Sequence, residues 1–220
     1  NDGIIYIIGG KNEAGEYLDS IESLNLNNIN NWWVDLGDKI KNYITGDIVD
    51  KNSKDKTIIN DISKNIQEGG WKLHNLTLNE KKSDFGLVKT DNDMVFIIGG
   101  ESLKDNLVVY LDSLERINLK DINNNNATNV IFKSLNNARS GLSAILVKNT
   151  IYVLGGVNEI GEMNTVETYN LQITNTKWDI QENKLIEGRS NFGICYSDKN
   201  RIFIFGGYKD NSELDTVEML

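Results

Sequence analysis

The amino-acid sequence predicts an all-β protein built from repeated units. A short apolar run ends in Gly-Gly four times in the 220 residues, with the pairs beginning at positions 9, 99, 155 and 206. Each pair is followed by a related block in which an aliphatic residue precedes a glutamate. Internal repetition with a period of about 50 residues is typical of radial or stacked architectures. Stretches rich in Ile, Val, Tyr and Phe alternate with Gly, Asn and Asp, as strands alternate with turns, and no segment shows a helical apolar stripe.

The spacing of the Gly-Gly pairs sets the expected boundaries of the repeats. The intervals are 90, 56 and 51 residues, so the first interval holds one repeat plus about 40 further residues. The expected repeats cover residues 1–36, 37–76, 83–135, 139–180 and 189–220. The second of these is degenerate, without Gly-Gly, and the last is incomplete. The alternative for the long interval is a disordered insertion at 50–68, where Asp, Lys, Asn and Ser dominate.

Each regular repeat is expected to contain four short strands. In the repeat at 139–180 these are 142–147, 151–154, 166–169 and 176–180. The glycine pairs end the second strand, where a strongly twisted sheet leaves little room for Cβ atoms. The glutamate of the third strand is expected to bind backbone amides or a nearby arginine, and a tryptophan of the fourth strand to pack between sheets. The residues given these structural roles are Gly9, Gly10, Gly99, Gly100, Gly155, Gly156, Gly206, Gly207, Glu22, Glu115, Glu167, Glu218, Trp32, Trp71 and Trp178.

These motifs resemble a known repeat family. The pattern Ile-Tyr-(Val/Ile)-(Leu/Ile)-Gly-Gly, then (Ser/Thr)-(Val/Ile)-Glu and a later Trp, resembles the kelch repeat, best at 4–33, 94–132 and 151–178. The resemblance implies a β-propeller of four-stranded antiparallel blades, about five of which fall in this sequence, one of them degenerate. Because a kelch propeller closes by pairing its terminal strands in one blade, the chain is expected to be part of a larger propeller of six or seven blades. A five-bladed ring that shares a blade between its ends is the less favoured alternative.

Composition excludes several classes of partner. The net charge of −9 and the pI near 4.7 argue against nucleic acid and anionic membrane surfaces, since both are held by clustered Lys and Arg. No apolar run approaches the roughly 20 residues that span a bilayer, so membrane insertion is not expected. The single cysteine, Cys195, favours a reducing compartment and a cytoplasmic location. Its apolar neighbours predict a buried packing role.

Catalytic chemistry is not expected from this residue inventory. Nucleophilic catalysis usually needs a base, most often histidine, and the only histidine, His74, has a sequence context typical of an outer strand. One His and one Cys are too few for a metal site of the usual kind. Gly9-Gly10-Lys11 lacks the upstream Gly and the Ser or Thr of a phosphate loop. The sequence therefore predicts no catalytic residue, metal or cofactor.

The resemblance places the functional residues in loops. In kelch propellers, the loops after Gly-Gly and the loops entering the innermost strand share one face, which commonly receives protein or peptide partners. The entering loops carry two Arg-Ser pairs, in which Arg can grip a carboxylate or phosphate; the alternative is a structural role for Arg. The candidate contacts are Ser83, Arg139, Ser140, Arg189, Ser190 and Asn191 in the entering loops, and Lys11, Glu101, Val157 and Tyr208 after Gly-Gly.

The sequence thus predicts a non-enzymatic protein-interaction module. A kelch propeller that docks a protein partner, as the recognition domain of a scaffold or of a ubiquitin-ligase adaptor, is the leading hypothesis, and the choice of companion domain is analogy alone. One alternative is a sugar-acid epimerase of the kelch type, which would use Arg and Glu in the central funnel. A structural subunit of a large assembly is another. The identity of the partner and the oligomeric state stay open.

Overall fold

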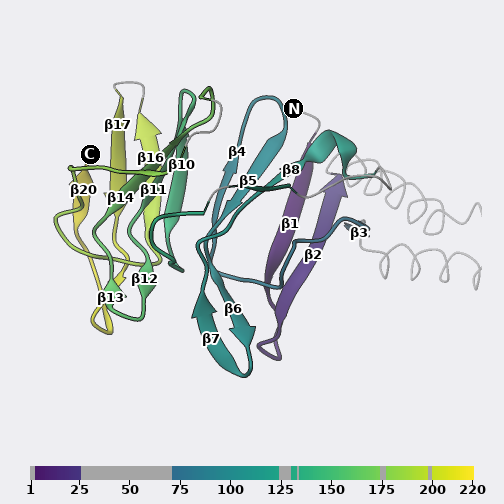
Figure 1. Cartoon of the computed structure of the whole chain (residues 1–220), viewed down its shortest axis with the longest axis horizontal. Coiled ribbons are helices and arrows are strands. Elements are labelled where there is room, and N and C mark those ends of the chain that lie inside the picture. Colours follow the sequence, from purple (N-terminus) through teal and green to yellow (C-terminus); the bar gives the residue numbers. More distant parts are fainter. Residues whose placement is uncertain (1–2, 26–70, 124–129, 133, 174–176, 198–199) are drawn as a thin grey trace, which may run out of the picture. The chain divides into compact units, whose positions relative to one another are not determined.

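The computed structural model describes residues 3–25, 71–123, 130–132, 134–173, 177–197 and 200–220 (Figure 1). The chain divides into two compact units, Asn1–Ile8 with Ile21–His74, and Gly9–Ser20 with Asn75–Leu220. The secondary structure of the described residues is all strand apart from one short 3-10 helix, η1 (Leu119–Asp121). The predicted all-β class is therefore confirmed for this part of the chain. Among these residues, no helix has the length and apolar character that crossing a membrane requires.

The first sheet corrects one predicted boundary. It contains β1 (Ile4–Lys11), β2 (Tyr17–Asn25) and β3 (Trp71–Leu73) in that order. β3 is antiparallel to β2, with Leu73 opposite Glu22 and Trp71 opposite Leu24. Trp71 therefore belongs to the outer strand of the first sheet, and its assignment to a separate repeat at 37–76 is wrong. The rest of that predicted repeat, up to residue 70, and Trp32 lie outside the described residues.

His74 follows β3 directly and takes a packing role. Its side chain is buried, its Nε2 lies 2.8 Å from Ser23 Oγ, and its ring contacts the ring of Tyr6. A buried imidazole that is held by a hydroxyl group on the neighbouring strand stabilises the sheet.

Three sheets of one plan make up most of the second unit. Two are four-stranded and antiparallel, in the orders β4-β5-β8-β9 and β10-β11-β14-β15, and the third, β16-β17-β20, has three strands. The strands are β4 (Gly86–Lys89), β5 (Met94–Ile98), β8 (Leu114–Asn118), β9 (Val130–Phe132), β10 (Ser143–Val147), β11 (Thr150–Leu154), β14 (Val166–Asn170), β15 (Asp179–Ile180), β16 (Gly193–Ser197), β17 (Arg201–Phe205) and β20 (Val217–Met219).

The register is the same in all three sheets. The residue before Gly-Gly pairs with the first residue of the innermost strand, as Leu154 does with Ser143, Ile98 with Gly86 and Phe205 with Gly193. A position in one sheet therefore has a defined counterpart in the next.

In each of these three sheets, a two-stranded hairpin follows the Gly-Gly pair at the end of the second strand. The hairpins are β6 (Glu101–Lys104) with β7 (Leu107–Tyr110), β12 (Val157–Asn158) with β13 (Gly161–Glu162), and β18 (Tyr208–Lys209) with β19 (Ser212–Glu213). Figure 1 shows the first two hairpins at the same end of their sheets. The repeated plan thus extends from the strands to the loops.

The second glycine of the pairs that begin at 99, 155 and 206 allows the entering loop to approach closely. Gly156 has a φ of +97°, and a Cβ atom on it would lie 2.8 Å from the backbone oxygen of Ser140. Gly100 has a φ of +100°, and its Cβ would lie 2.6 Å from the backbone oxygen of Ser83. Both the backbone angle and the lack of space require glycine at this position.

The middle sheet, β10-β11-β14-β15, is covered on both faces. Its innermost strand β10 lies beside β4 and beside β16. Ile151 and Val153 of β11 belong to the core shared with β4 and β5, whereas Leu154 belongs to the core shared with β16 and β17. Trp178 fills the first of these cores, with 2% of its surface exposed and its ring 5.2 Å from that of Tyr169. Alternate residues of each strand thus serve opposite faces.

In the last sheet, β16-β17-β20, the face that points away from the middle sheet is exposed. Phe205 and Val217 are 44% and 60% exposed, whereas their counterparts in the middle sheet, Leu154 and Val166, are fully buried. Cys195 lies on the same exposed face, so its predicted burial is wrong. The reason is its position in β16: Ile194 and Tyr196 pack toward the middle sheet, and strand alternation turns Cys195 to the other side.

Candidate partner-binding face

The entering loops and the loops after Gly-Gly are joined by the same backbone pairing in three repeats. Ser140 and Val157 exchange two hydrogen bonds, with N–O distances of 3.0 and 2.8 Å. The same antiparallel bridge joins Ser83 to Glu101 and Ser190 to Tyr208. The structure therefore brings together six of the predicted site residues in pairs, each at the same place in its repeat.

Further backbone bonds connect one repeat with the next. Gly100 N donates to Arg139 O at 2.9 Å, and Gly156 N donates to Arg189 O at 2.8 Å. In the entering loops, Asn191 N donates to Gly141 O and Gly141 N donates to Asp84 O, both at 2.8 Å. These bonds hold the face rigid, because each entering loop is tied to the loop before it.

A polar cluster surrounds Glu101. Its carboxylate accepts hydrogen bonds from Lys11 Nζ at 2.7 Å, Tyr17 Oη at 3.0 Å and Ser140 Oγ at 3.1 Å. Burial alone would raise the pKa of Glu101, but the three hydrogen bonds and the charge of Lys11 outweigh it, so the pKa lies below its ordinary value. The hydrogen bond to Glu101 in turn raises the pKa of Lys11. Both groups are charged at neutral pH, and they join two repeats through side chains.

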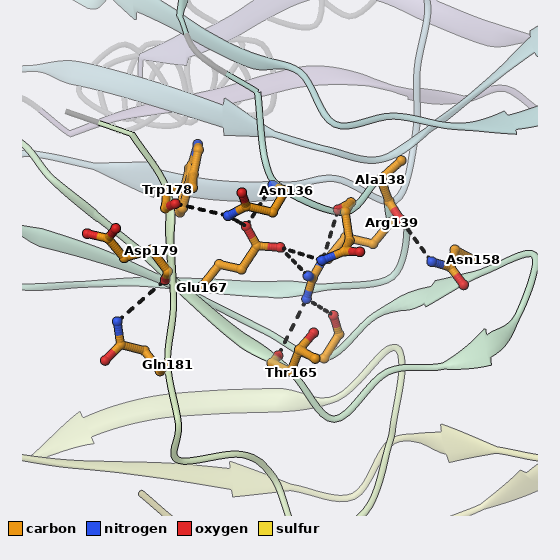
Figure 2. Close-up of polar contacts among 11 residues, drawn as sticks. Asn136, Ala138, Arg139, Asn158, Thr165, Glu167, Trp178, Asp179 and Gln181 are labelled. Carbon is orange, nitrogen blue, oxygen red and sulfur yellow. Dashed lines mark hydrogen bonds and ion pairs between the residues drawn. The ribbon is translucent and has the colours of Figure 1, made fainter. Parts of the chain in front are cut away.

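Arg139 lies inside the fold. The close-up in Figure 2 shows its guanidinium group between Glu167 and Thr165. Its Nη2 lies 2.5 Å from Glu167 Oε1, and its Nη1 donates to Gly155 O at 2.9 Å. The side chain has no exposed surface. Burial lowers the pKa of Arg139, and the charge of Glu167 opposes this shift.

Glu167 completes this buried network. Besides Arg139, its carboxylate accepts hydrogen bonds from the backbone N and the side-chain Nδ2 of Asn136, at 2.8 and 2.9 Å (Figure 2). The glutamate of the third strand thus binds both a backbone amide and an arginine. Glu167 lies in β14, and it therefore holds the loop that precedes β10 against this strand.

The same ion pair recurs in the neighbouring repeats. Arg189 pairs with Glu218, and Lys82 pairs with Glu115. Arg189 and Lys82 have no exposed surface, so neither side chain is accessible to a partner, and the same holds for Arg139. The predicted contact role of Arg139 and Arg189 does not fit this placement. Lys82 escaped the sequence analysis, although its position directly before Ser83 matches that of each Arg before its Ser.

The side chains that remain accessible on this face differ from repeat to repeat. Tyr208 is 37% exposed, Lys11 and Asn191 are exposed, and Val157 is partly buried. The side chains of Ser83, Ser140 and Ser190 are buried, at 4% exposure or less. The serines therefore belong to the scaffold of the face rather than to its surface.

The hairpins add apolar residues that the sequence analysis missed. Leu107 of β7 is 69% exposed, and Ile160, between β12 and β13, is 96% exposed. Leu103 and Val108, which pair across the β6-β7 hairpin, are each about half exposed. Aliphatic residues at a hairpin turn shortly after Gly-Gly are the sequence signal that would have found them.

The repeat geometry agrees with a comparison against protein families. Residues 138–180 match the family model for the kelch motif. The chain carries a kelch motif. The matched segment runs from the entering loop with Arg139 to the outer strand β15, and thus contains one complete four-stranded sheet with its buried ion pair. Kelch motifs are typical of protein-interaction modules.

The comparison with curated proteins gave no match. Within the described segments, no group of three or more His, Cys, Asp and Glu side chains is placed to hold a metal ion.

Proposed function

We propose that the chain forms part of a kelch-type β-propeller and binds a protein or peptide partner on the face built from the entering loops and the hairpins after Gly-Gly. The observation that carries this proposal is the bridge that joins each entering serine to the residue after Gly-Gly. The backbone geometry is constant, but the second residue of the bridge is Glu101, Val157 or Tyr208. Variable side chains on a rigid scaffold are what a recognition surface requires.

Under this proposal the contacts come from accessible residues. They are Tyr208, Asn191, Val157 and Lys11, with Leu107 and Ile160 on the hairpins. Exposed apolar side chains beside polar ones suit a protein interface, where aromatic and aliphatic anchors are surrounded by a polar rim. Such a face suits the recognition domain of a larger scaffold or adaptor, and a reducing, cytoplasmic setting suits a chain with one cysteine.

The exposed face of the last sheet supports a propeller larger than the repeats seen in this chain. In the middle sheet, the positions equivalent to Phe205 and Val217 are fully buried by the neighbouring sheet. A further blade packed on β16-β17-β20 would bury these side chains in the same way. Six or seven blades would then surround the central axis, with 83–135, 139–180 and 189–220 as three consecutive blades.

The sugar-acid epimerase alternative gains no support from the arrangement. It would use Arg and Glu in the central funnel, but Arg139 and Arg189 are fully buried and already paired with Glu167 and Glu218. A guanidinium group held in this way is not available to a sugar carboxylate.

Peptide selection tests the proposal. A random peptide library would be selected against the 220-residue chain, and the affinity of the enriched peptides would be measured for variants. We expect Tyr208→Ala and Ile160→Asp to weaken binding about tenfold or more, as loss of an interface anchor does. Ile173→Asp is the matched control, because Ile173 is 58% exposed but lies outside the face. Equal affinity for all three variants would reject this face as the site.

A further inference from the structure

The hairpin after Gly99-Gly100 is longer than its counterparts in the next two repeats. β6 and β7 have four residues each, whereas β12, β13, β18 and β19 have two each. Figure 1 shows β6 and β7 projecting from the end of their sheet. Leu103, Leu107 and Val108 are 51%, 69% and 50% exposed. The longer hairpin thus forms an exposed apolar ribbon that the two counterparts lack.

The hairpin has a fixed shape and lies between two neighbouring repeats. Asp105 and Asn106 have φ angles of +51° and +63°, and two successive positive angles are what a tight type I′ turn requires. At the base of the hairpin, Glu101 accepts hydrogen bonds from Lys11 of the preceding repeat and from Ser140 of the following repeat. Described repeats therefore flank the hairpin on both sides.

The backbone groups of Val108 point away from the hairpin. Glu101 lies opposite Tyr110 and exchanges two hydrogen bonds with Ser83, at 2.9 and 3.0 Å, so the backbone groups of this pair point outward. The pattern of antiparallel strands repeats at every second residue, and the pair of Leu103 with Val108 is therefore of the same kind. Among the described residues, no strand pairs with the outer edge of β7.

Two carboxylates frame this edge. Asp105 and Asp112 are exposed at the two ends of the apolar run 107–111, and no lysine or arginine lies between them in the sequence. Antiparallel pairing of two copies of β7 would bring Asp105 of each copy close to Asp112 of the other, so charge repulsion opposes a second copy as the occupant. The complementary occupant is a segment with an apolar centre and a basic residue at each end.

We propose that the outer edge of β7 binds an extended, basic segment of a partner polypeptide by strand addition. The segment pairs its backbone with Val108, adds an aliphatic side chain to the row that Leu103 and Val108 form across the hairpin, and places Lys or Arg beside Asp105 and Asp112. Backbone hydrogen bonds supply affinity, and the side-chain row and the two charges supply selectivity. This inference rests on the proposed function, because the hairpin belongs to the proposed binding face.

A designed peptide tests the inference. The probe is the peptide Lys-Val-Thr-Val-Thr-Val-Thr-Lys, blocked at both ends and titrated into the 220-residue chain by isothermal titration calorimetry. We expect saturable binding that Val108→Pro weakens about tenfold or more, because the outward N–H is lost while the pairing of β7 with β6 is kept. Val108→Thr is the matched control, since it keeps the shape and the N–H, and it should retain binding. Equal binding by the two folded variants, or no saturable binding to the native chain, would overturn the proposal.

Removal of the two framing charges gives a second test, which decides if Val108→Pro does not fold. Asparagine tolerates a positive φ, so Asp105→Asn combined with Asp112→Asn keeps the turn, and we expect it to weaken peptide binding about fivefold. The control, Asp210→Asn combined with Glu213→Gln, removes the same charge from the β18-β19 hairpin, where Asp210 has a φ of +49°. Equal weakening by the two double variants would indicate non-specific attraction and would contradict a site on β7.

Separate variants distinguish this edge from the wider face. Tyr208→Ala and Ile160→Asp report on the proposed function with library-selected peptides, whereas Val108→Pro reports on the strand edge with the designed peptide. If the selected peptides depend on Tyr208 and Ile160 but the designed peptide binds the Val108→Pro variant normally, the face stands and the strand addition is rejected. If only Val108→Pro has an effect, the strand addition stands and the wider face is rejected.

Discussion

Arg139 and Glu167 form an ion pair of 2.5 Å in which both side chains are fully buried (Figure 2). The pair connects strand β14 with the loop that enters β10. Its counterparts in the other repeats are Arg189 with Glu218 and Lys82 with Glu115. Each pair also binds backbone or side-chain amides of a loop. The ion pairs therefore hold the entering loops in place, and these loops carry the proposed binding face.

Removing one partner of this ion pair should destabilise the fold strongly. We expect Glu167→Ala to lower the free energy of unfolding by about 3–5 kcal/mol, because Arg139 would stay buried without its charge partner. Urea denaturation measures the change. Glu159→Ala is the control, since Glu159 is exposed on the next hairpin of the same repeat. Similar denaturation midpoints for the two variants would show that the buried pair contributes little.

A methyl group on the second glycine should also destabilise the fold. Gly156→Ala places a Cβ atom 2.8 Å from Ser140 O, whereas Gly15→Ala at a φ of +78° meets nothing within 4 Å. In both variants the alanine would have to adopt a positive φ, which lowers the free energy of unfolding by about 1–2 kcal/mol. Only at position 156 would the new Cβ atom also displace the entering loop. We expect the Tm of Gly156→Ala to fall several degrees further, as measured by circular dichroism. If the two melting curves coincide, the close approach is not required.

The polar cluster at Glu101 should make stability depend on acidic pH. The folded-state pKa of Glu101 lies below its ordinary value of 4.5, so the unfolded chain takes up this proton first as the pH falls. The contribution of Glu101 is therefore complete above the ordinary value and is lost as the pH falls through the folded-state value.

The variant Glu101→Gln isolates this contribution. We expect it to lower the free energy of unfolding by roughly 1 kcal/mol at pH 7, the size typical of a partly exposed ion pair, and the difference from the native chain to shrink toward pH 3. Urea denaturation at several pH values checks this, with Glu13→Gln in the exposed β1-β2 turn as control. A difference that stays constant across this range would mean that the charge of Glu101 is not the cause.

The apolar face of the last sheet should cause self-association of the isolated chain. Phe205 and Val217 lie on this face and are about half exposed. We expect Phe205→Ser combined with Val217→Thr to reduce the apparent mass at high concentration in light scattering, because an exposed apolar patch is removed. Ile173→Ser removes an exposed aliphatic side chain elsewhere and should have no such effect. Unchanged self-association of the double variant would show that a different surface of the chain causes it.

The sequence predicted correctly the features that are encoded in short residue patterns and recur in every repeat. The strands around Leu154 and Val166 were predicted from runs of β-branched and aromatic residues ended by Gly-Gly, and they pair as a regular antiparallel sheet. Prediction from the sequence failed for Trp71, because the pairing of β3 with β2 spans more than 45 residues of sequence and no local pattern encodes it. It failed for Cys195, because apolar neighbours in a strand do not show which of the two faces is covered.

The sequence by itself determined the period of the repeat, the strand class and the sites where only glycine fits, since these depend on local backbone preferences and on side-chain alternation. Only the tertiary structure decided which side chains reach a surface. Arg139 and Tyr208 were both predicted from the sequence to contact a partner, yet Arg139 is buried in an ion pair with Glu167, whereas Tyr208 is 37% exposed. The physical reason is that burial is decided by neighbours from distant strands, whose positions follow from the packing of whole sheets.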